Sequence, residues 1–226
     1  MRRQYIIMVL LVLVSTHAFS ATSTPSVYKT TVTKVELCSS SACSDPIVLG
    51  SGSKEFDIAS VSAQADVGTY LNDFTVTLGR TYTHVRSTIN ATMTTKGTVD
   101  VSGTTCNTVA SPTVAAASAT ATAKTAPSGT LAEMDWVVPD VNGGGDYADL
   151  TSDYNANGIS KTDGASTITF TVAIVSPYTP KATDTPKVSI KFDVSDTLEA
   201  TTSGGACILY LNPPCLLYTS PSPRDS

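Results

Sequence analysis

The chain has 226 residues and a formal net charge of −5, with 14 Lys and Arg residues against 19 Asp and Glu residues. Nucleic-acid binding requires clustered cations that neutralise phosphates, so this acidic and cation-poor composition predicts no nucleic-acid partner. The length suits one domain with a proper hydrophobic core.

Residues 1–20 have the pattern of a secretory signal peptide. Arg2 and Arg3 precede the apolar run Tyr5–Val14. Small residues follow at Ala18 and Ser20, which fits cleavage after Ser20. The apolar run is shorter than the ~20 residues needed to span a bilayer, and no later segment is apolar enough. We therefore expect a protein without a membrane span that is secreted, held at the cell surface or retained in the periplasm.

Most of the remaining chain is typical of short β-strands separated by turn residues. Val27–Leu37, for example, is rich in β-branched residues and alternates polar with apolar side chains. The other expected strands are Pro46–Leu49, Lys54–Ile58, Phe74–Leu78, Tyr82–Thr95, Thr98–Val101, Leu131–Val138, Ser166–Val175, Lys187–Val194 and Ala206–Leu211. Glycines at 50, 52, 79, 103, 204 and 205 mark the expected turns. Many short strands with such turns predict an all-β, antiparallel sandwich.

Three stretches carry a resemblance to a known domain. TVTKVELC, KEFDIASVSA and GRTYTHVRSTI follow one another between residues 27 and 89. In this order they resemble a bacterial exported domain of unknown function that is usually found on lipoproteins. The resemblance implies an immunoglobulin- or prealbumin-like sandwich, and it implies no catalytic residue. This chain lacks the lipoprotein cysteine of that domain.

Two long polar insertions interrupt the expected strands. The first, about residues 108–128, is a low-complexity Ala/Thr stretch. Ala favours helix and Thr opposes it, so we expect a flexible insertion with partial strand character, or a thin edge hairpin. The second is the acidic Gly/Asn-rich loop 140–164. With these insertions we expect a single sandwich domain over residues 21–214.

The acidic loop contains the front half of a calcium-binding pattern. Asp153, Asn155 and Asn157 alternate and are followed by Gly158, as calcium loops require. The back half departs from the pattern, because Gly164 stands where a bidentate Glu would be. The alternative is a polar surface turn, since Asn and Gly favour turns in any case. Calcium is the one cofactor that the sequence suggests.

The last residues differ in composition from the rest of the chain. Cys215–Asp225, CLLYTSPSPRD, resembles the translation of a transposon-type sequencing adaptor. We therefore expect residues 215–226 to be an artefactual tail. Asn212–Pro214 is typical of a connector that enters a further strand. On this interpretation the sandwich lacks its last strand.

The remaining cysteines form an even set. Without Cys215, the chain outside the tail holds Cys38, Cys43, Cys106 and Cys207. In an exported protein an even set predicts two disulfides, with three connectivities available. Cys38 and Cys43 flank one short loop, so a local bridge between them is the natural pairing. This leaves a long-range bridge from Cys106 to Cys207.

No motif predicts an enzyme. His84 is the one histidine outside the signal peptide, and no nucleophile motif accompanies it. The sequence favours an exported structural or interaction protein of the cell surface or extracellular matrix that associates with other chains or with itself. The alternative is a calcium- or glycan-binding module that uses the acidic loop with Trp136, Tyr147 and Tyr154, although a lone Trp is more often a core residue. An exported hydrolase is the second alternative.

Overall fold

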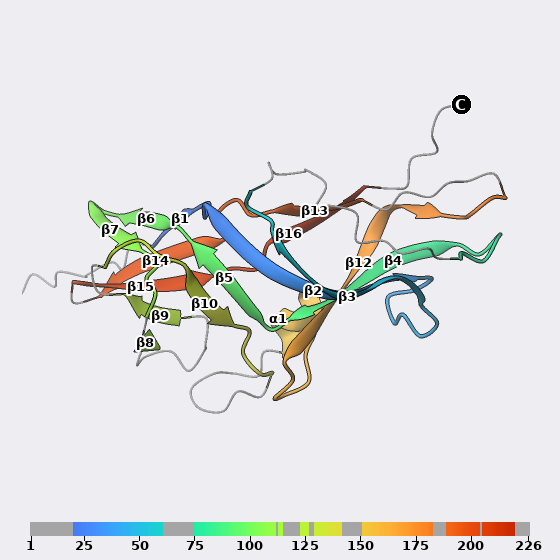
Figure 1. Cartoon of the computed structure of the whole chain (residues 1–226), viewed down its shortest axis with the longest axis horizontal. Coiled ribbons are helices and arrows are strands. Elements are labelled where there is room, and N and C mark those ends of the chain that lie inside the picture. The colour runs from blue at the N-terminus through green and yellow to red at the C-terminus, as the bar shows by residue number, and fades with distance from the viewer. Residues whose placement is uncertain are drawn as a thin grey trace, which may run out of the picture.

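The computed structural model describes residues 20–60, 75–111, 113–114, 123–126, 129–141, 151–182, 189–203 and 205–219. This part of the chain forms antiparallel strands and one short helix, a sandwich-like all-β fold (Figure 1). The elements are β1 Ser20–Ser23, β2 Val27–Cys38, β3 Ile47–Asp57, β4 Tyr82–Asn90, β5 Thr92–Lys96, β6 Thr98–Val101, β7 Thr104–Asn107, β8 Thr113–Val114, β9 Ala123–Ala126, β10 Met134–Val137, α1 Thr151–Ala156, β11 Ile159–Ser160, β12 Thr167–Tyr178, β13 Ser189–Asp193, β14 Leu198–Ser203, β15 Ala206–Leu211 and β16 Cys215–Thr219. The all-β prediction is confirmed. The predicted signal peptide covers residues 1–20; residues 1–19 lie outside the described part, and Ser20 begins β1.

The larger sheet, here called the long sheet, is built around β2. Its strand order is β10-β5-β2-β4-β12-β11, and β3 pairs with the other edge of β2. β2 pairs first with β5, through Val27–Lys29, and then with β4, from Val32 to Cys38. Ala91 alone separates β4 from β5: its N–H donates to the carbonyl of Ser166, and its carbonyl accepts from Val138. The sequence predicted a single strand over Tyr82–Thr95. The structure interrupts it at Ala91, because β12 pairs with the residues before this position and β10 pairs with those after it.

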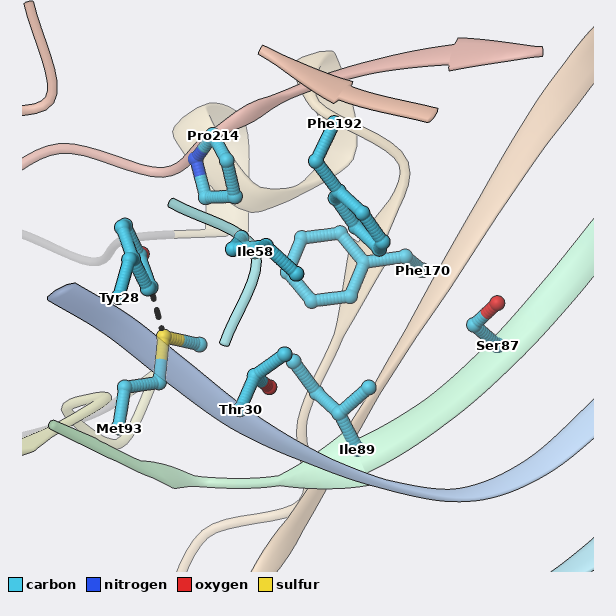
Figure 2. A pocket seen from close by; sticks show the side chains of 9 residues that line it. All are labelled: Tyr28, Thr30, Ile58, Ser87, Ile89, Met93, Phe170, Phe192 and Pro214. Carbon is cyan, nitrogen blue, oxygen red and sulfur yellow. Dashed lines mark hydrogen bonds between the residues drawn. The ribbon is translucent and has the colours of Figure 1, made fainter. Parts of the chain in front are cut away.

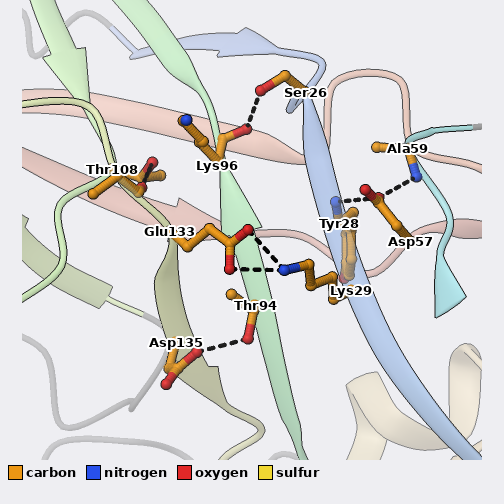
Figure 3. A network of polar contacts seen from close by, with 11 residues as sticks. Ser26, Tyr28, Lys29, Asp57, Ala59, Thr94, Lys96, Thr108, Glu133 and Asp135 are labelled. Atoms are coloured by element: carbon orange, nitrogen blue, oxygen red, sulfur yellow. Dashed lines mark hydrogen bonds and ion pairs between the residues drawn. The ribbon is translucent and has the colours of Figure 1, made fainter. Parts of the chain in front are cut away.

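Polar contacts tie β10 and the end of β3 to this sheet (Figure 3). The ammonium of Lys29 lies 2.7 Å from the carboxylate of Glu133, which precedes β10. The Oδ1 atom of Asp57 accepts hydrogen bonds from the backbone N–H groups of Tyr28 and Ala59, at 3.0 and 3.2 Å. The Asp57 side chain thus satisfies two donors where β3 ends.

The smaller sheet, here called the short sheet, has the order β1-β14-β15-β9-β8 and lies at the left of Figure 1. The β6–β7 hairpin packs against β1 and β14. Together with β10 these elements enclose one of two hydrophobic cores, which we call the disulfide core. Its buried members are Val99, Val101, Cys106, Met134, Trp136, Leu198, Ala200, Cys207 and Leu209.

The other core, here called the sheet core, fills the curved face of the long sheet. Alternate residues of β4 point into it, as the period of a strand requires. β13 and the residues after it cover this core with Phe192 and Val194. Its buried members are Tyr28, Val32, Val35, Leu37, Leu49, Ile58, Tyr82, Val85, Ile89, Ala91, Met93, Ile168, Ile174 and Val194.

Two cysteine pairs lie at disulfide distance, and both are those that the sequence predicted. Cys38 and Cys43 have Cα atoms 4.9 Å apart and lie five residues apart in the chain. Cys106 on β7 and Cys207 on β15 have Cα atoms 5.6 Å apart across 101 residues. The second bridge joins the β6–β7 hairpin to the short sheet.

Several expected elements differ in the structure. Gly50–Gly52 was expected to form a turn, but these residues lie inside β3, where the register with β2 shifts. Residues 75–78 form no strand, because Leu78 and Gly79 begin a turn and the Thr77 N–H donates to the Tyr82 hydroxyl. In the low-complexity insertion, β8 and β9 pair as a hairpin at the edge of the short sheet, which agrees with the expected partial strand character.

The adaptor-like tail also carries a strand. β16, Cys215–Thr219, pairs antiparallel with β13 over five residues. The expected position of a further strand after Pro214 is thus filled by these residues. Their origin as an adaptor stays a prediction. Across the described ranges, no helix is long and apolar enough to cross a membrane.

Candidate functional site

The acidic segment 140–164 is held on β12 by a glycine. β11 pairs with β12, and the Thr171 N–H donates to the Gly158 carbonyl at 2.8 Å. Gly158 has a φ of +64°, and a Cβ atom at this position would lie 2.3 Å from the Thr171 carbonyl oxygen. A side chain is excluded on both grounds. The close approach fixes the end of α1 against the long sheet.

The three residues of the calcium prediction lie on and just after α1. Asp153 and Asn155 are helical, and Asn157 begins the turn that leads into Gly158. Asn155 and Asn157 are exposed, whereas the side chain of Asp153 lies outside the described part. Among the described side chains, no three His, Cys, Asp or Glu residues group as metal ligands. Calcium binding stays a prediction.

The acidic segment already contains a cation of the protein itself. The Lys161 ammonium is 4 % exposed, pairs with the Asp140 carboxylate and donates to the Val138 carbonyl at 2.8 Å. The hydrogen bond from Lys161 and a second one from the Gly164 backbone lower the pKa of Asp140. Asp163 accepts from the Val141 N–H at 2.8 Å. Two of the carboxylates in this segment therefore have partners within the chain.

The aromatic residues proposed for a glycan platform do not form one in the described part. Trp136 is 1 % exposed, and its indole N–H donates to the Thr95 hydroxyl at 2.7 Å. Its more frequent role, as a core residue, is therefore the observed one. Tyr154 donates to the Pro139 carbonyl, and burial together with the charges of Asp140 and Asp163 raises its pKa to about 12. Tyr147 lies outside the described residues.

A charged cluster lies across β2 and β4. The Glu36 carboxylate, 3 % exposed, is 2.7 Å from Arg86 Nε and 3.1 Å from Lys34 Nζ. Burial would raise the pKa of Glu36, but the hydrogen bonds from Arg86 and Lys34 outweigh it, and the pKa is lowered. His84, two residues before Arg86 and on the same side of β4, has its Nδ1 atom 2.8 Å from the Thr83 hydroxyl. This arrangement of charges stabilises the sheet, and the hydroxyl that contacts the histidine belongs to its neighbour in the chain, Thr83.

The two edges of the long sheet differ in chemistry. β3 forms one edge and carries Lys54, Glu55 and Asp57, two register irregularities and a glycine at a φ of +110°. Charges, bulges and strong local twist are features by which natural edges resist further strand pairing. The β3 edge is thus protected.

The β12 edge has none of these charges. No residue from Thr167 to Tyr178 is charged, and β11 covers only Thr169 and Phe170 on this side. Val175 is 77 % exposed, against 46 % for Val48 on β3. The Gly158 carbonyl accepts from Thr171 on the same side, and β16 lies near β12 but pairs with β13. In the described part no strand pairs with the β12 edge beyond Thr171. Uncharged, exposed edges of this kind are templates for another strand.

The sequence predicted β12 as a strand, but it did not predict that this strand lies at an edge of the long sheet. The absence of charge over twelve residues was visible in the sequence, yet a buried central strand has the same composition. Only the pairing of β12 with β4 on one side distinguishes the two cases.

No family model matches the chain, and neither the curated proteins nor the solved structures contain a match.

Proposed function

We propose that this chain is an exported structural or interaction protein of the cell surface or extracellular matrix that associates by strand addition along β12. The observation that carries the proposal is the contrast between the two sheet edges. β3 is charged, whereas β12 is uncharged and exposes Val175. Both strands contain a register irregularity, so charge is what distinguishes the two edges.

A second copy of the chain is the partner that this edge fits best. In a twofold dimer the same segment pairs with itself in antiparallel orientation. Because Thr167–Tyr178 has no charge, such self-pairing places no like charges opposite each other. The free N–H and C=O groups of an edge strand supply the hydrogen bonds.

Export is supported by the two cysteine pairs at disulfide distance, since disulfides persist in oxidising compartments. The signal-peptide prediction makes this testable by itself. Expression of the full chain in a bacterial host should give a product outside the cytoplasm whose N-terminal residue is Ala21. A product that keeps residues 1–20 and stays in the cytoplasm would contradict the exported part of the proposal.

The association is tested by placing a charge on each edge in turn. Sedimentation equilibrium of the wild type should show concentration-dependent dimers or larger assemblies. Val175→Lys should weaken the association constant about tenfold or more, because a charge on an edge strand opposes pairing. Val48→Lys makes the same change on the protected edge and should leave association unchanged. Circular dichroism checks that both variants fold.

Two results would overturn the proposal. One is a wild type that stays monomeric at millimolar concentration. The other is an equal effect of Val48→Lys and Val175→Lys, which would show that net charge rather than the β12 edge controls association.

A further inference from the structure

Two cavities lie side by side under the curved face of the long sheet. The smaller, of about 30 Å³, is shown in Figure 2, and the larger has about 200 Å³. Tyr28, Met93 and Phe170 line both of them. In Figure 2 the Tyr28 hydroxyl is hydrogen-bonded to Met93 Sδ, at 3.3 Å. The two spaces therefore share a wall that contains a flexible methionine side chain.

The larger cavity has an apolar and aromatic wall. Trp136, Tyr154, Ile159 and Ile168 contribute to it, and the connector at Asn212 and Pro213 forms part of its rim. Among the described residues, none that lines either cavity is charged. A charged ligand would lose its hydration without gaining a counter-charge, so these walls select against ions.

The smaller cavity supplies hydrogen-bonding capacity that the described protein does not use. The hydroxyl oxygens of Thr30 and Ser87 are buried and have no hydrogen-bond partner within the protein. The two residues are 4 % and 5 % exposed, and both line the smaller cavity. Buried hydroxyls are normally paired, because an unpaired one costs about 1–3 kcal/mol. Ser87 faces Val35, five residues beyond Thr30 on β2, so the two hydroxyls lie too far apart to share one partner. The unpaired Thr30 hydroxyl, which lies nearer to Met93 in Figure 2, therefore indicates a group that bonds to it.

We propose that these cavities form a binding site for a neutral, ring-sized amphipathic molecule. Its apolar body occupies the larger cavity beside Trp136 and Tyr154. Its hydroxyl or carbonyl group passes Met93 and hydrogen-bonds to Thr30, the unpaired hydroxyl that lies nearer to Met93 in Figure 2. The site uses the side chains of Ile168 and Phe170 on β12, whereas the association proposed above uses the backbone edge of that strand.

The volume sets the class of ligand. An apolar cavity of about 150 Å³ accommodates benzene, so the larger cavity suits one six-membered ring with a short substituent. The lack of charge in the walls restricts the polar part to a neutral group. Cyclohexanol meets both conditions and absorbs no light that would interfere with tryptophan fluorescence.

Two residues of the cavity walls, Trp136 and Met93, can report ligand binding spectroscopically. Trp136 is the only tryptophan and lines the larger cavity. Titration of the purified protein with cyclohexanol should give a saturable change in its fluorescence. With ¹³C-methyl-labelled methionine, the Met93 resonance should shift, whereas Met134, buried in the disulfide core, should not. Cyclohexylamine, a cation at neutral pH, should cause neither change.

Matched variants locate the two ends of the ligand. Val138→Phe fills the larger cavity and should weaken cyclohexanol binding about tenfold or more. Val137→Phe, one residue earlier and 43 % exposed, is the control and should bind as the wild type does. Thr30→Val combined with Ser87→Ala removes both hydroxyls and should weaken binding about fivefold, the effect of one lost hydrogen bond.

Each of these measurements either supports the proposed ligand site or contradicts it. The proposal is overturned if cyclohexanol gives no saturable Trp136 signal and no Met93 shift in the wild type. It is also overturned if Val138→Phe, or the hydroxyl-free double variant, binds cyclohexanol as tightly as the wild type. If Val138→Phe fails to fold, the Met93 and Met134 resonances of the wild type still decide whether the larger cavity is occupied.

Discussion

The disulfide core and the sheet core differ in how they are cross-linked and in how completely they are filled. The disulfide core is closed by Cys106–Cys207, which joins strands 101 residues apart. The sheet core has more buried residues and contains no cysteine; the other bridge, Cys38–Cys43, lies at the end of β2 and spans only five residues. Both cavities and the two unpaired buried hydroxyls lie on the side of the sheet core.

We therefore expect the two cores to contribute differently to stability and to binding. A long-range cross-link restricts the unfolded chain more than a short one does, so the disulfide core is expected to supply most of the covalent stabilisation. The sheet core, which is less completely filled, has room for a ligand and presents the β12 edge. Four experiments test this difference between the two cores, and they follow in order of decreasing expected effect.

The largest effect should come from the long-range bridge. Replacing Cys106 and Cys207 together by Ala should lower the free energy of unfolding by about 5 kcal/mol, and replacing Cys38 and Cys43 by about 2 kcal/mol, because the entropy of loop closure grows with loop length. Urea denaturation of the two double variants measures both values. Equal losses would show that the two bridges do not differ in the way proposed.

The next effect concerns Gly158, which docks the acidic segment on β12. Gly158→Ala should destabilise the protein by about 3 kcal/mol, because it combines a left-handed backbone with a clash against the Thr171 carbonyl. Gly164→Ala is the matched control: its φ is +77°, but its Cβ would meet nothing within 4 Å. We expect that variant to lose about 1 kcal/mol in thermal or urea unfolding. Similar losses would mean that the close approach to β12 contributes little.

A smaller effect should appear in acid. The folded-state pKa of Glu36 is lowered, so its ion pairs stabilise the protein above about pH 4.3, the ordinary pKa of a Glu side chain. This stabilisation is lost as the pH falls below that value and the carboxylate protonates. Glu36→Gln should therefore reduce the change in unfolding free energy between pH 6 and pH 3. Glu55→Gln, at an exposed position on β3, should keep the acid dependence of the wild type.

The smallest effect tests calcium. If Asp153, Asn155 and Asn157 bind the ion, calcium at ten times its dissociation constant should stabilise the protein by about 1.4 kcal/mol. Asp153→Asn should abolish the rise in melting temperature, whereas Asp100→Asn, in the β6–β7 hairpin, should keep it. A wild type whose melting temperature does not respond to millimolar calcium would leave the acidic segment as a polar turn.

Some elements could be predicted closely from the sequence. Val27–Leu37 and Ala206–Leu211 became β2 and β15 with almost the expected bounds, since β-branched alternation and flanking turn residues specify a strand locally. β14, Leu198–Ser203, was not predicted, because its ladder with β1 and β15 rather than its composition makes it a strand. The same holds for Gly50–Gly52, where pairing with β2 overrides two glycines.

The candidate sites show the same limit. The cysteine pairs could be inferred from count and spacing, and the core position of Trp136 from its general tendency. The cavities could not, because their walls combine residues from β2, β5, β10, β12 and the Asn212–Pro214 connector. Nor could the partner of Lys161 be inferred, since Asp140 lies 21 residues earlier in the chain.

The sequence by itself determined the all-β class, both cysteine pairs and most strand positions, because alternation, turn residues and cysteine spacing act over short distances. The tertiary structure alone decided which strand became an edge, which hydroxyls remained unpaired and where space was left between the strands. Those properties depend on which segments meet across the fold, and no local pattern in the chain records that.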